Sequence, residues 1–213
     1  YLNCFPNISA LISYNDEGTA AGGTALLIKH HSLGILPETI HWSTGLNGRV
    51  TTAHFTKDDE NIHFASIYAP HDPSERVNFL QELFSSDLIT ENTLSGGDFN
   101  CVPNIHLDTA STTKLPYPNK GAHQLETGMA NLGHTDILRA NTGKKGKPIY
   151  TRLSSTRNSR LDRWYGPHRD KNRFSSELDL HFLPPHFSDH IPVTLTIRNL
   201  KSRDWGLGYN RIN

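Results

Sequence analysis

The sequence has few cysteines and no long apolar run. None of its 213 residues belongs to a stretch near the roughly 18 consecutive apolar residues that a membrane-spanning helix needs. The first residues lack the basic and apolar regions of a secretory signal. The two cysteines, Cys4 and Cys101, form no metal-binding spacing, so we expect reduced thiols rather than a zinc site or a disulfide scaffold. Membrane-spanning and disulfide-rich classes are therefore excluded.

Net charge is also absent, because 21 Lys and Arg balance 21 Asp and Glu. The charges are unevenly placed, however: residues 139–173 contain 11 Lys or Arg and only two Asp. Such a block is commonly a solvated face, but Lys and Arg also bind a phosphate backbone by releasing its counterions. Most of the 13 histidines stand alone in the sequence. We expect histidines such as His30, His31, His41, His54 and His63 to be surface or strand residues rather than ligands.

Apolar periodicity predicts more strands than helices and a single α/β domain. A helix is expected to begin near Asp72, because an acidic cap and a first-turn proline precede apolar residues at helical spacing. A second helix is predicted over 124–132. The predicted strands are 11–14, 22–28, 48–56, 62–68, 149–152, 161–165, 177–180 and 191–197. This pattern favours two mainly antiparallel sheets packed face to face, with helices outside.

Two short segments carry the chemistry. In the first, a Gly96-Gly97 turn is followed by Asp98 and Asn100, whose side chains leave an extended backbone on the same side. The second, residues 188–190, adds a carboxylate and an imidazole. Each segment alone is ordinary turn or surface chemistry. Brought together, their groups suit metal-assisted hydrolysis of a phosphodiester.

The order of five segments resembles the endonuclease/exonuclease/phosphatase family. They are Ile67-Tyr68-Ala69-Pro70, Gly97-Asp98-Phe99-Asn100, Tyr150-Thr151, Ser159–Arg163 and Ser188-Asp189-His190-Ile191-Pro192. The resemblance implies a four-layer α/β sandwich over residues 1–198, a C-terminal linker at 199–213, and Mg²⁺ or Mn²⁺ as cofactor. Within the family, the chain is most similar to the endonuclease domains of non-LTR retrotransposon polyproteins. Its tail, 203–213, is similar to the segment that leads from such endonucleases toward the reverse transcriptase.

The resemblance also implies roles for individual residues. Asp98 would orient and deprotonate the attacking water, Asn100 and Tyr68 would donate to the phosphate, and His190 would stabilise the developing charge. His190 would be kept cationic by Asp189 or by a carboxylate across the cleft. Asp162 would lie near the leaving oxygen or its metal.

Further residues are implied around this group. Thr151 and Ser188 would complete a hydrogen-bonded shell that binds substrate, and Arg160 and Arg163 would contact the DNA. The metal ligands on this chain would be Asp98 and Asp189.

One part of the family pattern has no match. Members carry a metal-binding Glu in a Gln-Glu pair and an upstream Asn, and the alignment of 22–25 places both before Tyr1. Glu17 is a poor substitute, because it lies in an expected turn. Since there is also no initiator Met, we expect a piece of a longer reading frame that lacks the first strands. We favour such a fragment over a decayed copy, and we expect it to bind metal weakly and to nick DNA little by itself.

Alternatives of other classes stay open. The chain could be a catalytically inactive nucleic-acid-binding relic of the same fold, an abasic-site repair endonuclease or an unrelated α/β protein. A lipid phosphodiesterase is disfavoured, because no apolar surface loop is present. The basic block favours DNA as the partner, with no membrane. We expect an intracellular protein, nuclear when it acts on DNA, followed by a reverse transcriptase domain in the full polyprotein.

Overall fold

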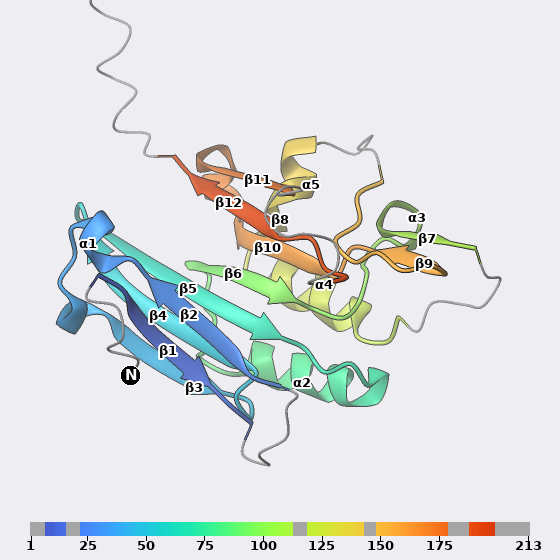
Figure 1. Cartoon of the computed structure of the whole chain (residues 1–213), viewed down its shortest axis with the longest axis horizontal. Coiled ribbons are helices and arrows are strands. Elements are labelled where there is room, and N and C mark those ends of the chain that lie inside the picture. The colour runs from blue at the N-terminus through green and yellow to red at the C-terminus, as the bar shows by residue number, and fades with distance from the viewer. Residues whose placement is uncertain (1–6, 16–21, 113–118, 143–147, 179–187, 199–213) are drawn as a thin grey trace, which may run out of the picture.

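A six-stranded mixed sheet forms the centre of the computed structural model (Figure 1), which describes residues 7–15, 22–112, 119–142, 148–178 and 188–198. The strand order is β3-β4-β5-β6-β10-β8, and only β5 and β6 are parallel neighbours in this sheet. The strands are β3 (His41–Gly45), β4 (Val50–Lys57), β5 (Glu60–Tyr68), β6 (Thr93–Asp98), β10 (Asp162–Pro167) and β8 (His134–Asp136).

The predicted hairpin over 48–68 is confirmed as β4 and β5. Asp58 and Asp59 form its two-residue turn, with φ values of 49° and 63°. Positive φ at both central residues is the geometry that matches the twist of the flanking strands, and Asp tolerates it better than most residues. The tight turn sets the register that continues from Lys57–Glu60 to Val50–Ile67.

Both predicted helices are present, and they cover one face of the sheet. Helix α2 (Pro73–Ser85) begins after Asp72, whose side chain accepts hydrogen bonds from the amides of Ser74 and Glu75. Helix α4 (Ala122–Asn131) packs beside α2. Leu80, Leu83, Leu125 and Met129 join Ala65 and Ile67 of β5 in the main apolar core. The core on this face is thus closed by the two amphipathic helices.

Two hairpins form a second layer on the other face of the sheet, in front in Figure 1. One consists of β1 (Ser9–Ser13) and β2 (Thr24–Ile28), and the other of β11 (Phe174–Leu178) and β12 (Val193–Ile197). A smaller core with Ile28 and Phe55 lies under the first, and another with Leu94 and Phe174 lies under the second. The α/β class is therefore as predicted, although within the described residues the second layer is two hairpins and not one continuous sheet.

The remaining elements are short. They are α1 (His30–Leu33), η1 (Pro37–Thr39), α3 (Ile105–Asp108), β7 (Thr109–Ser111), α5 (Ile137–Thr142), β9 (Arg157–Ser159) and η2 (His168–Arg173), with β7 paired to β9. The strand predicted over 149–152 does not form; Arg152 makes only isolated bridges to Ser159 and His190. No described helix has the length and apolar character needed to cross a membrane. The predicted linker at 199–213 lies outside the described residues.

Candidate active site

Three predicted site residues stand in one row across the central sheet. Tyr68 at the end of β5 is the register partner of Asp98 at the end of β6, and Asp98 is the partner of Asp162 at the start of β10. Residues directly opposite each other in neighbouring strands point to the same face. The sheet therefore places a phenol and two carboxylates side by side at one edge, as the prediction of a shared site requires.

The two glycines before Asp98 do not form the predicted turn; they lie inside β6. A Cβ on Gly96 would approach the Trp164 ring to 2.6 Å, and a Cβ on Gly97 would lie 1.9 Å from the carbonyl oxygen of Ile67. Gly97 also has φ of 149°, which L residues rarely adopt. The glycines thus allow β5, β6 and β10 to approach closely just before the site.

Asn100 does not continue the extended backbone that was predicted. Its φ is 50°, in the left-handed region that Asn tolerates better than most residues. Its backbone N–H donates to Asp98 Oδ1 at 2.8 Å, and its side-chain Nδ2 donates to the carbonyl oxygen of Ala69 at 2.8 Å. The carboxamide is therefore fixed between the ends of β5 and β6, next to the Asp98 carboxylate.

His190 reaches the same row from a segment 28 residues after Asp162. Its Nδ1 lies 2.9 Å from Asp162 Oδ2. The hydrogen bond to Asp162 raises the pKa of His190 above its ordinary value, and burial opposes this increase. Of the two predicted possibilities, Asp189 or a carboxylate across the cleft, it is Asp162 that holds the imidazole. The predicted place of Asp162 near the leaving oxygen or its metal stays a prediction.

The charged form of Asp98, unlike that of His190, is destabilised by its surroundings, because Asp98 is mostly buried and lies beside a second carboxylate. Burial and the charge of Asp162 raise the pKa of Asp98 from 3.8 to about 6, against the lowering effects of the Asn100 amide and of His190. Both causes penalise the ionised form. The site therefore contains more negative charge than its single imidazole can compensate.

A cation would relieve this excess. One oxygen of each of Asp98 and Asp162 and one ring nitrogen of His190 all lie within 4.8 Å of one another. His190 Nδ1 is already bonded to Asp162, so the carboxylate oxygens of Asp98 and Asp162 are the natural ligands for the cation. Paired carboxylates suit a hard ion such as Mg²⁺, which keeps several bound waters. The residues present thus fit such an ion.

Asp189 does not belong to this group of possible ligands, in contrast to the prediction. Its exposed carboxylate accepts a hydrogen bond from Arg152 Nε at 2.9 Å. That bond is the main cause that lowers the pKa of Asp189. The carboxylate that accompanies Asp98 is Asp162.

Thr151 supports the site from inside instead of binding substrate as predicted. It is fully buried, and its hydroxyl oxygen accepts hydrogen bonds from the backbone amides of Leu161 and Asp162, at 2.9 and 3.0 Å. Its carbonyl oxygen accepts from the amide of Ile191. Thr151 therefore ties the start of β10 to the segment that carries His190. Ser188 is exposed, and its hydroxyl accepts from the His190 amide, so its contact with substrate stays a prediction.

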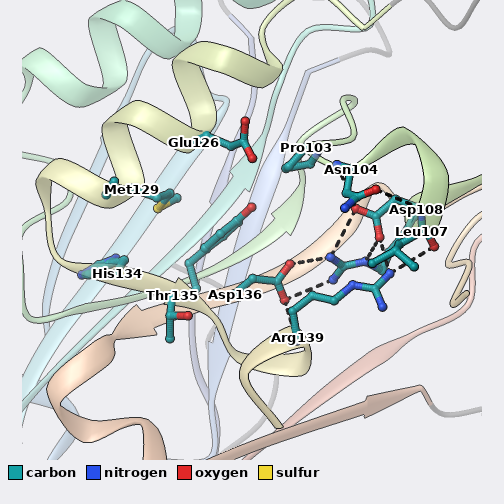
Figure 2. A pocket seen from close by; sticks show the side chains of 13 residues that line it. Pro103, Asn104, Leu107, Asp108, Glu126, Met129, His134, Thr135, Asp136 and Arg139 are labelled. Atoms are coloured by element: carbon teal, nitrogen blue, oxygen red, sulfur yellow. Dashed lines mark hydrogen bonds and ion pairs between the residues drawn. The ribbon is translucent and has the colours of Figure 1, made fainter. Parts of the chain in front are cut away.

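Arg160 and Arg163 are not available to DNA, which corrects their assignment as substrate contacts. Both side chains are buried, and together with Asp108, Asp136 and Arg139 they form what we call the arginine cluster. Arg160 Nε lies 2.8 Å from Asp108 Oδ1, and Arg163 Nη2 lies 3.1 Å from Asp108 Oδ2. Figure 2 shows Asp108, Asp136 and Arg139 of this cluster beside a pocket of about 680 Å³ on this side of the molecule. The charges of Arg160 and Arg163, which were predicted to lie on the surface, are instead paired with Asp108 in the interior.

The basic block at 139–173 is consequently not one continuous surface for DNA. Besides the three arginines of the arginine cluster, Arg152 is paired with Asp189, and Arg173 is paired with Glu60 at 2.5 Å. Residues 144, 145 and 147 lie outside the described part of the chain.

Arg49 is a neighbour of the site that the sequence did not indicate. Its guanidinium carbon lies 5.5 Å from the centre of the Tyr68 ring, and its Nη1 lies 3.4 Å from the Tyr68 carbonyl oxygen. Its position just before β4 carries no motif. Only the pairing of β4 with β5 brings it to the site.

Comparisons with solved structures support this fold. The chain is similar to the endonuclease domain of TRAS1, a telomere-specific non-LTR retrotransposon, with 14% identity, a TM-score of 0.59, and coverage of 92% of this chain and 82% of that one. It is similar to an AP endonuclease from Archaeoglobus fulgidus, with 18% identity, a TM-score of 0.68, and coverage of 90% and 80%. An endonuclease/exonuclease/phosphatase family protein from Leptotrichia buccalis matches with 14% identity, a TM-score of 0.54, and coverage of 90% and 71%.

No family model and no curated protein matches the sequence. The likeness therefore lies in the structure, where it extends over about nine tenths of the chain. The chain has the fold of the endonuclease/exonuclease/phosphatase nucleases.

Proposed function

We propose that this protein is a metal-dependent phosphodiesterase that nicks DNA, an endonuclease of the non-LTR retrotransposon type. The observation that carries the proposal is the convergence of Asp98, Asp162 and His190, three polar groups within 4.8 Å from segments far apart in the sequence. Two carboxylates beside a held imidazole, at the edge of a sheet, form a site that a phosphate and its counterion can complete.

Asp98 is suited to accept a proton from the attacking water. A general base works best when its pKa lies near the working pH. In the metal-free site, burial and Asp162 bring the pKa of Asp98 to about 6, closer to neutrality than that of an ordinary carboxyl group. The Asn100 amide fixes one oxygen of Asp98, which leaves the other to face water.

His190 supplies positive charge for the phosphate. Asp162 holds its Nδ1 and favours the imidazolium, so that Nε2–H is free to donate to a phosphate oxygen as negative charge develops. Asn100 and Tyr68 flank the same row and offer neutral donors. Asp162 thus acts through His190 and positions it.

A divalent ion such as Mg²⁺ or Mn²⁺, held by the oxygens of Asp98 and Asp162, would polarise the phosphate and neutralise developing charge. Asp189 stays a proposed ligand only if its bond to Arg152 opens.

The choice of DNA is supported by the likeness to the TRAS1 endonuclease domain and by the cationic side chain of Arg49 beside Tyr68. Nuclear action and a following reverse transcriptase domain belong to the same proposal.

Relaxation of supercoiled plasmid by the 213-residue chain tests this function. We expect slow Mg²⁺-dependent nicking by this chain, as its sequence predicts, and a further fall of about 10²–10³-fold in Asp98→Asn and in His190→Gln, the usual cost of removing one such group. Asp59→Asn, in the exposed turn between β4 and β5, and His168→Gln, in exposed η2, are matched controls that should keep activity. Wild-type and Asp98→Asn rates that do not differ would contradict the proposal.

Binding of the same DNA separates an enzyme from an inactive binding relic. An enzyme should lose turnover in Asp98→Asn while its affinity for DNA stays the same. A chain that binds DNA tightly and never cleaves it, with or without Asp98, is the relic.

Abasic-site repair is the second candidate, because the AP endonuclease gives the larger TM-score of 0.68. A duplex oligonucleotide with one abasic site, compared with its intact counterpart, distinguishes the two. The retrotransposon-type proposal predicts comparable nicking of both, whereas a repair enzyme prefers the abasic duplex strongly.

A further inference from the structure

Three histidines stand side by side across the outer strands of the central sheet. His41 of β3 is the register partner of His54 of β4, and His54 is the partner of His63 of β5. The His41 and His54 ring centres lie 5.8 Å apart, and the His54 and His63 rings are stacked at 4.1 Å. We call these three residues the histidine ladder. Because each histidine comes from a different strand, their spacing in the sequence gives no sign of it.

The ladder is distinct from the candidate active site. His63 lies five residues before Tyr68 on β5, which corresponds to roughly 16 Å along a strand. Since five is odd, the two side chains point to opposite faces of the sheet. The ladder shares its face with Ala65 and Ile67, on the side that α2 covers.

The ladder lines a small pocket of about 200 Å³. The connector between α2 and β6 also lines this pocket, through Asp87 and Thr90. The pocket therefore combines three imidazoles with a carboxylate and hydroxyl groups, and it has space for an ion with bound water.

One ladder atom lacks the partner that a buried polar atom normally has. His54 Nε2 is buried, and no hydrogen-bond partner for it is found in the described part of the chain. Each such atom in a folded protein calls for an explanation, and an ion or water is a usual one. Burial, followed by the effect of His54, lowers the pKa of His63, which favours the neutral ring that a metal binds.

We propose that the histidine ladder is a binding site for a divalent transition-metal ion of the Zn²⁺ type. Imidazole is a preferred ligand of these ions, at 2.0–2.1 Å from the nitrogen. Opposite residues in an antiparallel pair have Cβ atoms about 4.5–5.5 Å apart, close enough for two imidazoles to share one ion. The three histidines are not among the described groups whose ligand atoms all lie within 4.8 Å of one another. Binding therefore requires the stacked rings to rotate so that their nitrogens converge, with Asp87 or water completing the coordination.

The bound ion would act on the sheet rather than on the reaction. Among the strands that the structure describes, β3 is the edge strand of the six-stranded sheet and has β4 as its only neighbour there. An ion held by His41, His54 and His63 would join β3 to β4 and β5 through side chains. Binding to the folded form alone must then raise the melting temperature.

Titration of Zn²⁺ into metal-free protein tests the site, with the double variant Asp98→Asn/Asp162→Asn as the starting chain so that the active-site carboxylates do not compete. We expect one tightly bound Zn²⁺ per chain, and a melting temperature about 5 °C higher or more at 100 times the dissociation constant. Co²⁺ should give the visible absorption of a tetrahedral site.

His63→Gln and His41→Gln, each added to that background, should weaken Zn²⁺ binding by at least about tenfold, the loss seen when only a supporting group is removed. His41 is exposed, so its variant should fold even if the His63 variant does not. His168→Gln in η2 is the matched control and should keep binding and stabilisation. Zn²⁺ binding that is absent, or that is unchanged in His41→Gln and His63→Gln, overturns the proposal.

Discussion

The arginine cluster and the site row of Asp98 and Asp162 lie on opposite faces of β10, and they shift the pKa values of their carboxyl groups in opposite directions. In the arginine cluster, three guanidinium groups surround Asp108 and Asp136, and the arginines, led by Arg163, lower the pKa of Asp108 to about 2 against the effect of burial. At the site row, the ion pair found in the described residues is that of His190 with Asp162, and burial together with the charge of Asp162 raises the pKa of Asp98 to about 6.

We interpret the buried charges of the arginine cluster as structural and those of the site row as chemical, because their carboxyl pKa values are shifted in opposite directions. In the arginine cluster the negative charge is fully compensated, because each carboxylate meets more than one guanidinium group. The site row is incomplete, because its negative charge exceeds its positive charge. Residues 162 and 163 are neighbours in sequence, yet strand alternation sends one to each group. The same substitution, Asp to Asn, should therefore have opposite effects on stability in the two places.

The largest change is expected for Asp108→Asn. Removing one partner of a buried ion pair leaves uncompensated charge and costs about 3–5 kcal/mol. Three arginines lose part of their counter-charge here, so the free energy of unfolding, measured in urea, should fall by about this amount. Asp59→Asn, in an exposed turn, should change it little. A loss below about 1 kcal/mol would show that the cluster contributes no net stability.

Asp98→Asn should stabilise the metal-free protein at pH 7. The ionised Asp98 opposes folding, because its pKa is raised from 3.8 to about 6 in the fold, and each unit corresponds to about 1.4 kcal/mol. A gain of about 1–3 kcal/mol in urea unfolding is expected, together with the loss of nicking. Destabilisation by Asp98→Asn would mean that the two groups do not differ in the proposed way.

The two carboxyl groups should also give the stability–pH curve two slopes of opposite sign. Asp108 has a depressed pKa, so its contribution is present above about pH 4 and is lost as the pH falls toward about 2. Asp98 has a raised pKa, so its ionisation removes stability as the pH rises from about 4 to above 6.

Metal-free protein should therefore be most stable near pH 4–5, with changes of about 2 kcal/mol on each side. Unfolding followed from pH 2 to 8 measures this curve. Asp98→Asn should flatten the neutral side and leave the acid side in place. A curve whose neutral side is the same with and without Asp98 would contradict the assignment.

Asp162→Asn should lower the pKa of His190 toward its ordinary value. The hydrogen bond to Asp162 is the largest cause of the increase, and Asp189 is the smallest of the causes involving a neighbouring side chain. An NMR titration of the His190 ring protons measures the change. Asp189→Asn is the comparison variant and should move the pKa much less. Equal shifts in the two variants would return Asp189 to its predicted role.

The smallest effect is expected for Arg152→Ala. Its ion pair with Asp189 is substantially exposed, with 41% and 52% of the two side chains accessible. Exposed pairs contribute about 0–1 kcal/mol. Urea unfolding should show a change within this range, and a larger one would place this pair with the buried arginine cluster in its energetic role.

Local patterns made much of the fold predictable from the sequence. The cap and spacing of α2, the β4–β5 hairpin, and the meeting of Asp98 with His190 were all expected. Partners that lie far apart in the chain were not. Asp108 precedes Arg160 by 52 residues, and no motif links them, so the basic block was interpreted as surface.

The alternation of side chains along a strand could have corrected the assignment of Arg163 to the substrate side. With Asp162 assigned to the site, the next residue must point to the other face of β10, which removes Arg163 from the substrate side. The conformation of the Gly96-Gly97 pair, by contrast, depends on Trp164 and Ile67, which only the assembled sheet brings near.

The position of two neighbouring residues in β10 has a consequence for how this gene can vary. Point substitutions around 162 and 163 can be examined one at a time, since each side chain serves a different face. Loss or gain of a single codon there would exchange the faces, turning a guanidinium toward the reaction and a lone acid into the interior. Homologous chains should therefore show amino-acid substitutions in β10 far more often than insertions or deletions.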